Sequence, residues 1–172
     1  MNTRLAPYLR VILPLILQVV FFQYVSVGGG WWYLGFHLLG ILLLPLQRSG
    51  LSILLFSAVF GAAIDFACHG GGLFMSSAVL MGLFIPIVNR LLAPREGYEI
   101  SDQPTISLMG SRWFLVRTFL LLFIHNTWMF SIEAGRWDLL LLAWGKATAS
   151  TLLTTVIFAL TLLLTQRKTR SR

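Results

Sequence analysis

Long apolar segments, separated by short polar connectors, follow one another along almost the whole chain. A helix that crosses a bilayer needs about 20 mainly apolar residues. The pattern predicts six such helices, at about residues 8–27, 31–46, 51–67, 72–93, 113–132 and 139–165. The second of them is short and begins at Trp31 and Trp32, a residue type enriched at membrane interfaces. The expected fold class is therefore an all-α integral membrane protein with six transmembrane helices.

The connectors between these predicted helices are mostly short and contain glycine, as at Gly28–Gly30, Gln47–Gly50 and Gly70-Gly71. Short turns of this kind place consecutive helices side by side and antiparallel. The exception is the polar loop at 94–112, which contains half of the acidic residues of the chain. The sequence shows no soluble domain or clear repeat, so residues 1–172 are expected to form a single membrane domain.

Charge predicts the orientation of the helices. Only 11% of the residues are charged, against about 25% in soluble domains, and the formal net charge is +7. Most basic residues lie beside apolar segments, which indicates contact with anionic lipid and argues against a nucleic-acid partner. If both termini and the loop at 94–112 are cytoplasmic, the outer connectors keep only Arg136. The positive-inside rule favours that arrangement.

Candidate catalytic and metal-binding motifs are incomplete. His69–Gly72 reads HGGG, like an esterase oxyanion loop, but the chain lacks the Gly-x-Ser-x-Gly motif that an esterase also needs. The single cysteine, Cys68, excludes an internal disulfide and a cysteine-based metal cluster. His37 and His125 lack the spacing of zinc ligands, so we expect them to form hydrogen bonds between helices, with a proton or substrate relay as the alternative. No enzyme activity, cofactor or metal is predicted.

Ionisable residues inside the apolar segments are the most informative positions. Asp65, Glu133 and Lys146 all fall in the predicted outer half of the bundle, and an unpaired charge there is costly. We expect Lys146 to pair with Asp65 or with Glu133. The alternative is that each carboxylate lies at the interface, in contact with water. Arg117 lies about one turn into the fifth predicted helix and is expected to extend its head group to the cytoplasmic surface.

Pairs of small residues four positions apart, such as Ser57 with Gly61 and Ala78 with Gly82, predict close contacts between helices.

One stretch of the chain, GAAIDFACHGGGLFMSSAVLMGLFIPIVNRLLAPREGYE at 61–99, resembles the rod shape-determining protein MreD family, in the form found in Bacteroidetes-type bacteria. The similarity continues through nearly the whole chain, including the predicted six-span plan. The matching positions are Gly61, Asp65, Gly72, Pro86, the motif Pro94–Glu99, Gly110–Phe114, His125, Glu133-Ala134, Lys146 and Ser150. One position departs from the family pattern, because Ile85 stands where members carry a basic residue.

The resemblance implies a non-catalytic membrane scaffold of the cell-elongation complex, which regulates cell shape and peptidoglycan synthesis in the bacterial cytoplasmic (inner) membrane. The implied partners are a MreC-like single-pass protein, a MreB-like filament, RodA and a penicillin-binding protein. The sequence does not decide whether the chain also forms a homodimer. The residues implied for contact with cytoplasmic partners are Arg95, Glu96, Tyr98, Glu99 and Arg112.

The family's fold also resembles the S components of vitamin uptake transporters, and the expected architecture is therefore an S-component-like bundle. This gives an alternative function, a substrate-binding subunit whose pocket would open outward near Asp65, His69 and Glu133. The short outer connectors, which leave no obvious lid, argue against it.

Overall fold

The computed structural model describes residues 16–20, 32–99 and 102–165, and in these ranges the regular structure is helical, without a strand. Residues 16–20 are helical, while the rest of the first predicted span, 8–27, lies outside the described residues. The remaining elements are α2 (Leu38–Leu42), α3 (Gly50–Cys68), α4 (Leu73–Leu91), α5 (Ile106–Met109), α6 (Ser111–Ala134), η2 (Trp137–Leu139) and α7 (Leu140–Thr165).

Four helical stretches are long and apolar enough to cross a membrane: α3, α4, α6, and α7 together with η2. They correspond to the predicted helices at 51–67, 72–93, 113–132 and 139–165. These four predictions are confirmed as helices of sufficient length and hydropathy to span a membrane. The chain is therefore a multi-pass helical membrane protein with four candidate spans in its described part.

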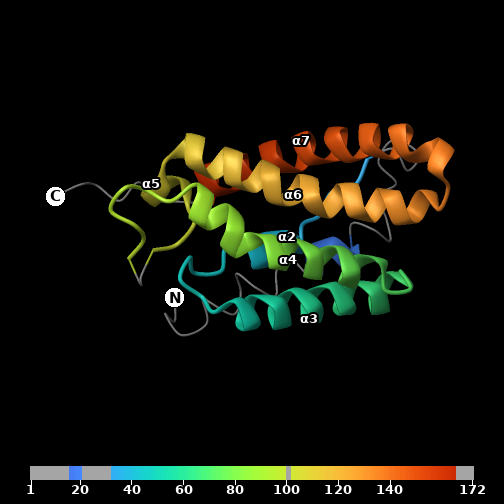
Figure 1. The fold of residues 1–172 in the computed structure, drawn as a ribbon, viewed down its shortest axis with the longest axis horizontal. Helices are drawn as coiled ribbons and strands as arrows, with labels where there is room; N and C mark the ends of the chain where they lie inside the picture. The colour runs from blue at the N-terminus through green and yellow to red at the C-terminus, as the bar shows by residue number, and fades with distance from the viewer. Residues whose placement is uncertain (1–15, 21–31, 100–101, 166–172) are drawn as a thin grey trace.

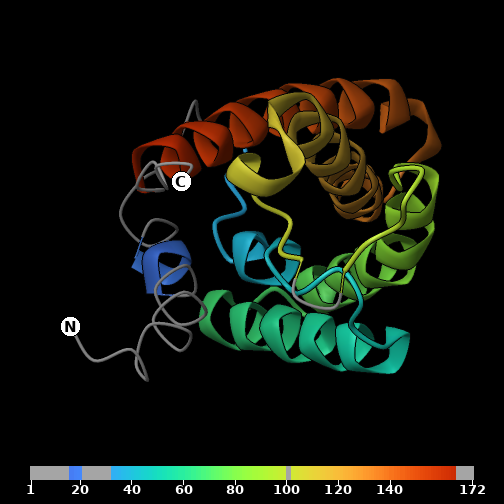
Figure 2. The same ribbon diagram turned by 90° about the vertical axis from the view of Figure 1, so that its left-hand side faces the viewer.

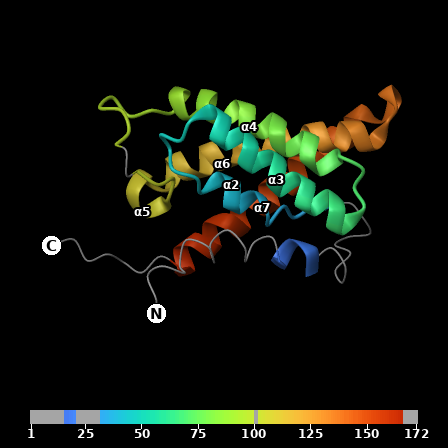
Figure 3. The ribbon, with the colours of Figure 1, turned by 90° about the horizontal axis from the view of Figure 1, so that it is seen from below.

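The long helices form two antiparallel hairpins, α3 with α4 and α6 with α7, and α4 packs against α6 (Figure 1). We call the end that carries α5 and the loop before it the loop end, and the end with the two tight turns the hairpin end. Viewed from the loop end, the long helices lie on three sides of α2, and the helical residues 16–20 lie on the fourth side (Figure 2). The view from below shows α2 between α3, α6 and α7 (Figure 3).

The second predicted span, 31–46, is wrong as a continuous helix. Within 32–46 the structure contains only the five-residue α2, and the flanking backbone is not helical. Pro45 stands where the helix would have to continue, and proline lacks the N–H that an interior turn requires. Most of the segment is nevertheless buried, so it is a core element of the bundle and has little surface for lipid.

The contact between α3 and α4 depends on two glycines. A Cβ atom at Gly61 would lie 2.8 Å from the carbonyl oxygen of Phe74, and a Cβ atom at Gly82 would lie 2.5 Å from Oγ of Ser57. These distances leave no room for a side chain, so the two helices approach at small residues, as the pairs in the sequence predicted.

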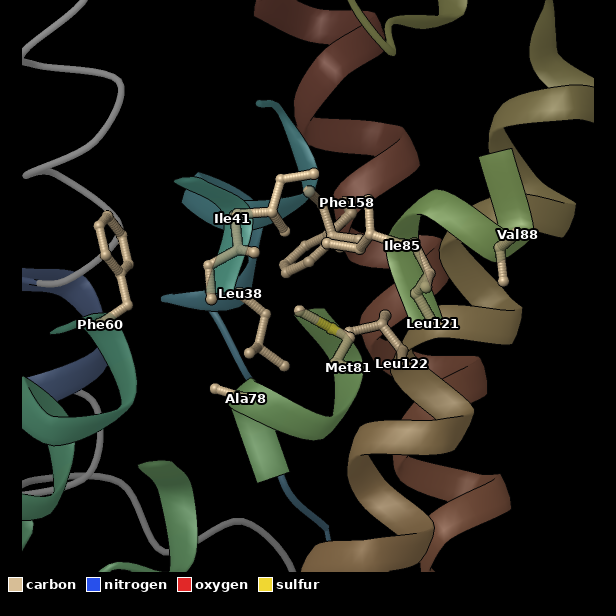
Figure 4. Close-up of a cluster of buried hydrophobic side chains, with 12 residues drawn as sticks. Leu38, Ile41, Phe60, Ala78, Met81, Ile85, Val88, Leu121, Leu122 and Phe158 are labelled. Carbon is tan, nitrogen blue, oxygen red and sulfur yellow. The ribbon is translucent and has the colours of Figure 1, made fainter. Parts of the chain in front are cut away.

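Buried apolar side chains from α2 and all four long helices form one of two core clusters among the described residues (Figure 4). Leu38 and Ile41 extend from α2 toward the space between the other helices, where they meet the side chains of α4, α6 and α7. The short central helix therefore fills the interior that the long helices leave between them. The residues labelled in the close-up are Leu38, Ile41, Phe60, Ala78, Met81, Ile85, Val88, Leu121, Leu122 and Phe158.

Candidate functional site

Asp65 caps the helix that follows its own. Helix α4 begins after Gly72, which has no side chain to accept from the first amides of the helix. Asp65 on α3 supplies that acceptor: its Oδ1 accepts from the backbone nitrogen of Phe74 at 3.1 Å, and its Oδ2 accepts from that of Met75 at 2.8 Å. A carboxylate at a helix N-terminus satisfies otherwise unpaired donors and interacts favourably with the helix dipole. The structure thus gives Asp65 a fold-determining contact at the hairpin end.

Glu133 and Lys146 do not complete the expected ion pairs. Between described residues, the ion pair within 4 Å is that of Arg136 with Asp138. Glu133 is exposed near the end of α6, and Lys146 is half-buried on α7. Within the described part of the chain no ion pair within 4 Å joins Lys146 to Asp65 or to Glu133, and Asp65 instead accepts from two backbone nitrogens of α4.

Arg117 is a buried cation at the loop end, contrary to the expectation that it reaches the surface. Its side chain is only 1% exposed. Nε donates to Oδ1 of Asn89 at 2.7 Å, Nη1 donates to the carbonyl oxygen of Leu42 at 2.9 Å, and Cζ lies 5.5 Å from the centre of the Trp113 ring. The guanidinium group thus ties the C-terminal end of α2 to α4 and α6, without a carboxylate partner among the described residues.

A tight turn projects from the loop end, at Pro94–Glu99, which we call the PREGYE turn. The backbone nitrogen of Gly97 donates to the carbonyl oxygen of Pro94 at 3.0 Å, and Gly97 has a φ of 79°. Asp102 also contacts the end of the turn, since its Oδ2 accepts from the backbone nitrogen of Glu99 at 2.8 Å. The turn is therefore held by hydrogen bonds within the chain itself.

Tyr98 anchors this turn to the bundle. Its hydroxyl donates to the carbonyl oxygen of Asn89 at 2.8 Å, its own carbonyl oxygen accepts from Nε2 of Gln47, and its ring packs edge-on against Trp113. Partial burial raises the pKa of Tyr98 above its ordinary value of 10.0. Asn89 therefore contacts both Tyr98 and Arg117: its backbone carbonyl accepts from the Tyr98 hydroxyl, and its side-chain oxygen accepts from Nε of Arg117.

The charged residues predicted at the loop end are exposed around this anchor: Arg95, Glu96, Glu99 and Arg112. Tyr98, predicted with them as a contact residue, is instead half-buried. Pro86 lies inside α4 with its side chain exposed, away from the turn. Four of the predicted residues, Arg95, Glu96, Tyr98 and Glu99, therefore belong to the PREGYE turn. Pro86 instead lies on the exposed surface of α4, a candidate span.

A polar seam runs through the interior, between α7 and the irregular segment before α2. The backbone nitrogen of Tyr33 donates to Oγ of Ser150 at 3.0 Å, and Oγ1 of Thr154 donates to the carbonyl oxygen of Tyr33 at 3.3 Å. Non-helical backbone at membrane depth needs such internal partners, because lipid offers none. Farther along the seam, Nδ2 of Asn126 on α6 donates to Oγ1 of Thr151 at 2.9 Å.

Two histidines lie beside this seam. His37 and His125 are fully buried, their ring centres are 6.0 Å apart, and Tyr33 stacks on His125. His125 does not bond across helices as expected, because its Nδ1 lies 3.2 Å from Oδ1 of Asn126, the next residue on α6. Among the described residues, neither Nε2 atom has a hydrogen-bond partner. Buried polar atoms of this kind are rare in native proteins, so this cluster is the most unusual chemistry of the interior.

No hydrogen-bonding role was predicted from the sequence for several of these residues: Asn89, Asn126, Ser150, Thr151 and Thr154. The available signal was polar side chains within apolar helices, which in a membrane usually face the bundle interior. Among the described residues no group of three or more His, Cys, Asp or Glu could hold a metal ion. The interior can donate and accept hydrogen bonds, while the loop end offers a fixed, charged surface.

Comparison of the chain with protein-family models, curated proteins and solved structures gives no match.

Proposed function

We propose that the chain is a non-catalytic scaffold of the bacterial cell-elongation complex, as its resemblance to the MreD family implies. It would lie in the cytoplasmic membrane with the loop end in the cytoplasm. The exposed Arg48, Arg90, Arg95 and Arg112 all lie at the loop end, and Arg136 lies at the hairpin end, a distribution that supports this orientation.

The observation that carries the proposal is the PREGYE turn. A catalytic role would require convergent groups around a reaction site, whereas this motif presents exposed charges of both signs on a backbone held by Tyr98 and Asp102. A preordered surface loses little conformational entropy when a partner binds. We assign the turn to cytoplasmic partners such as a MreB-like filament, and the lipid-facing helices to a MreC-like single-pass protein.

The test is purification of the tagged chain from its native membranes in mild detergent, with partners identified by mass spectrometry. We expect a MreC-like protein, RodA and a penicillin-binding protein to be recovered. The double charge reversal Arg95→Glu, Glu96→Lys should reduce recovery of the MreB-like filament and leave the MreC-like protein. Gln103→Lys, an exposed change outside the turn, is the control. Recovery of an ATPase module and a coupling subunit would refute the scaffold function.

A second candidate function, the S-component-like substrate-binding subunit, is favoured by one observation. Interrupted helices and buried polar groups are typical of membrane sites that bind small substrates. The irregular segment around α2 has this character, and so do the Nε2 atoms of His37 and His125, which have no hydrogen-bond partner in the described part of the chain. Native mass spectrometry of the purified chain tests it: a small molecule retained by the wild type and lost in His37→Phe would favour this function over the scaffold.

A further inference from the structure

A hollow opens at the hairpin end, on the outer surface of the turn between α6 and α7. Its volume is about 270 Å³. It is lined by Trp128, Ser131 and Ile132 of α6, by Arg136 and Trp137 at the turn, and by Leu140 at the start of α7. We call it the α6–α7 hollow. It does not overlap the PREGYE turn or the buried histidines.

The tryptophans around the hollow locate it at the membrane interface. Trp128 and Trp137 line it, and Trp144 lies beside it, with its Nε1 donating to Oγ of Ser131 at 3.3 Å. Tryptophan concentrates at the level of the lipid head groups, where its ring is in an apolar surrounding and its N–H reaches polar groups. A ligand in the hollow would therefore lie with one part among head groups and one part among acyl chains.

The rim of the hollow carries an exposed pair of opposite charges. Nε of Arg136 donates to Oδ1 of Asp138 at 3.0 Å, and Nη2 donates to Oδ2 at 2.7 Å. The side chains are 70% and 60% exposed. Nη1 of Arg136 donates to no described residue, and each carboxylate oxygen keeps a lone pair, so both groups can bind a further ligand.

This pair selects for the charge pattern of a ligand. A zwitterionic head group offers a phosphate to Arg136 and an ammonium to Asp138, whereas an anionic head group without an ammonium meets the carboxylate unfavourably. The apolar wall below, at Ile132 and Leu140, suits an acyl chain. A free phosphate would not use that wall.

We propose that the α6–α7 hollow binds one zwitterionic phospholipid with an ammonium head group, of the phosphatidylethanolamine type. Its phosphate contacts Arg136, its ammonium contacts Asp138, and an acyl chain lies against Ile132. The site uses none of the residues assigned to cytoplasmic partners, so it can be tested separately from the PREGYE turn.

Native mass spectrometry of the full chain, exchanged into detergent with equal amounts of phosphatidylethanolamine and phosphatidylglycerol, tests the site. The wild type should retain phosphatidylethanolamine about two- to fivefold over phosphatidylglycerol, the ratio expected for an exposed charge contact. Asp138→Asn should remove or reverse the preference, because Arg136 then faces the lipid alone. Arg136→Gln should reduce retention of both lipids.

Arg95→Gln at the loop end is the matched control and should leave the preference unchanged. Thermal unfolding of each variant confirms that the bundle is intact before lipids are compared. Equal retention of the two lipids by the wild type would overturn the proposal. A preference that survives in Asp138→Asn, or a hollow closed to lipid by a second copy or a partner helix, would overturn it as well.

Discussion

Nε of Arg117 donates to Oδ1 of Asn89 at 2.7 Å, inside the loop end of a bundle that is largely apolar. The cation is held by an amide, a backbone carbonyl and an aromatic ring, and all three are neutral. Such an arrangement fixes the charge in one geometry, because Nε and Nη1 of the planar guanidinium are each directed at one acceptor. The contact therefore sets how the end of α2 meets α4 and α6.

Removing the amide of Asn89 should weaken the bundle. Asn89→Ala leaves the buried guanidinium without one acceptor, and a hydrogen bond to a charged group contributes about 1.5–3 kcal/mol. We expect a lower thermal unfolding midpoint in detergent, measured by tryptophan fluorescence. Arg90→Ala, which changes the exposed neighbour, is the control. Equal midpoints for the two variants would show that the contact with Arg117 contributes nothing.

Truncation of Asp65 should cost about 0.5–2 kcal/mol of unfolding free energy, as for other helix caps. In Asp65→Ala the backbone donors of Phe74 and Met75 lose their acceptors, whereas Asp65→Asn keeps one oxygen and should lose less. The exposed Glu133→Ala should stay within about 0.5 kcal/mol of the wild type. Chemical unfolding in mixed micelles measures all three. An Asp65→Ala variant as stable as Glu133→Ala would contradict the capping role.

Alanine at Gly61 should be poorly tolerated, because the added methyl group meets the backbone of α4 and backbone cannot rotate aside. Overpacking of this kind costs about 1–3 kcal/mol. Gly145→Ala is the matched control, since its Cβ would have nothing within 4 Å, and a helical Gly→Ala change is otherwise stabilising.

The unfolding midpoints of these two alanine variants should therefore move in opposite directions. A Gly61→Ala variant that unfolds at or above the wild-type midpoint would show that α3 and α4 can separate without loss. In Gly82→Ala the close atom is the Ser57 side chain, so adding Ser57→Ala should recover part of the stability.

The anchor at Tyr98 predicts a dependence of stability on alkaline pH. The folded state raises the pKa of Tyr98, so the unfolded chain ionises first as pH increases. The stabilisation is complete below about pH 10, the unfolded value, and is lost as pH rises through the folded pKa. An ionised Tyr98 also cannot donate to the carbonyl oxygen of Asn89.

Unfolding midpoints from pH 8 to 11 would measure this effect. At pH 8, Tyr98→Phe should be less stable than the wild type by about 0.5–1.5 kcal/mol, the contribution of one hydrogen bond. Above pH 10 the difference should narrow, because ionisation of Tyr98 then favours the unfolded wild type. A constant difference across the range would exclude ionisation of Tyr98 as the cause.

Hydrophobic periodicity and length predicted the last four helices well, because lipid requires long apolar helices whose backbone is internally bonded. They failed at 31–46, where no single long helix forms. Most of the apolar residues of this segment are buried against neighbouring helices and are not exposed to lipid as those of a spanning helix are. A one-dimensional pattern does not distinguish these two environments, since both require apolar side chains.

The roles of charged residues were harder to predict than their positions. Asp65 was correctly recognised as unusual, but its partners are backbone amides, which leave no mark in the sequence. Arg117 was expected at the surface because it lies near a helix end. It is buried instead, because Asn89 and the end of α2 supply hydrogen-bond acceptors for its guanidinium group. Both differences depend on tertiary neighbours that come together only in the folded bundle.

The bonds of Tyr33 to Ser150 and Thr154 also have a consequence for biosynthesis. The acceptor and donor that satisfy this backbone lie 117 and 121 residues later in the chain. While the ribosome is still making α6, the segment around α2 has no such partners and no spanning helix of its own. These two hydrogen bonds can form only after α7 has emerged, so the nascent protein completes this part of its interior last.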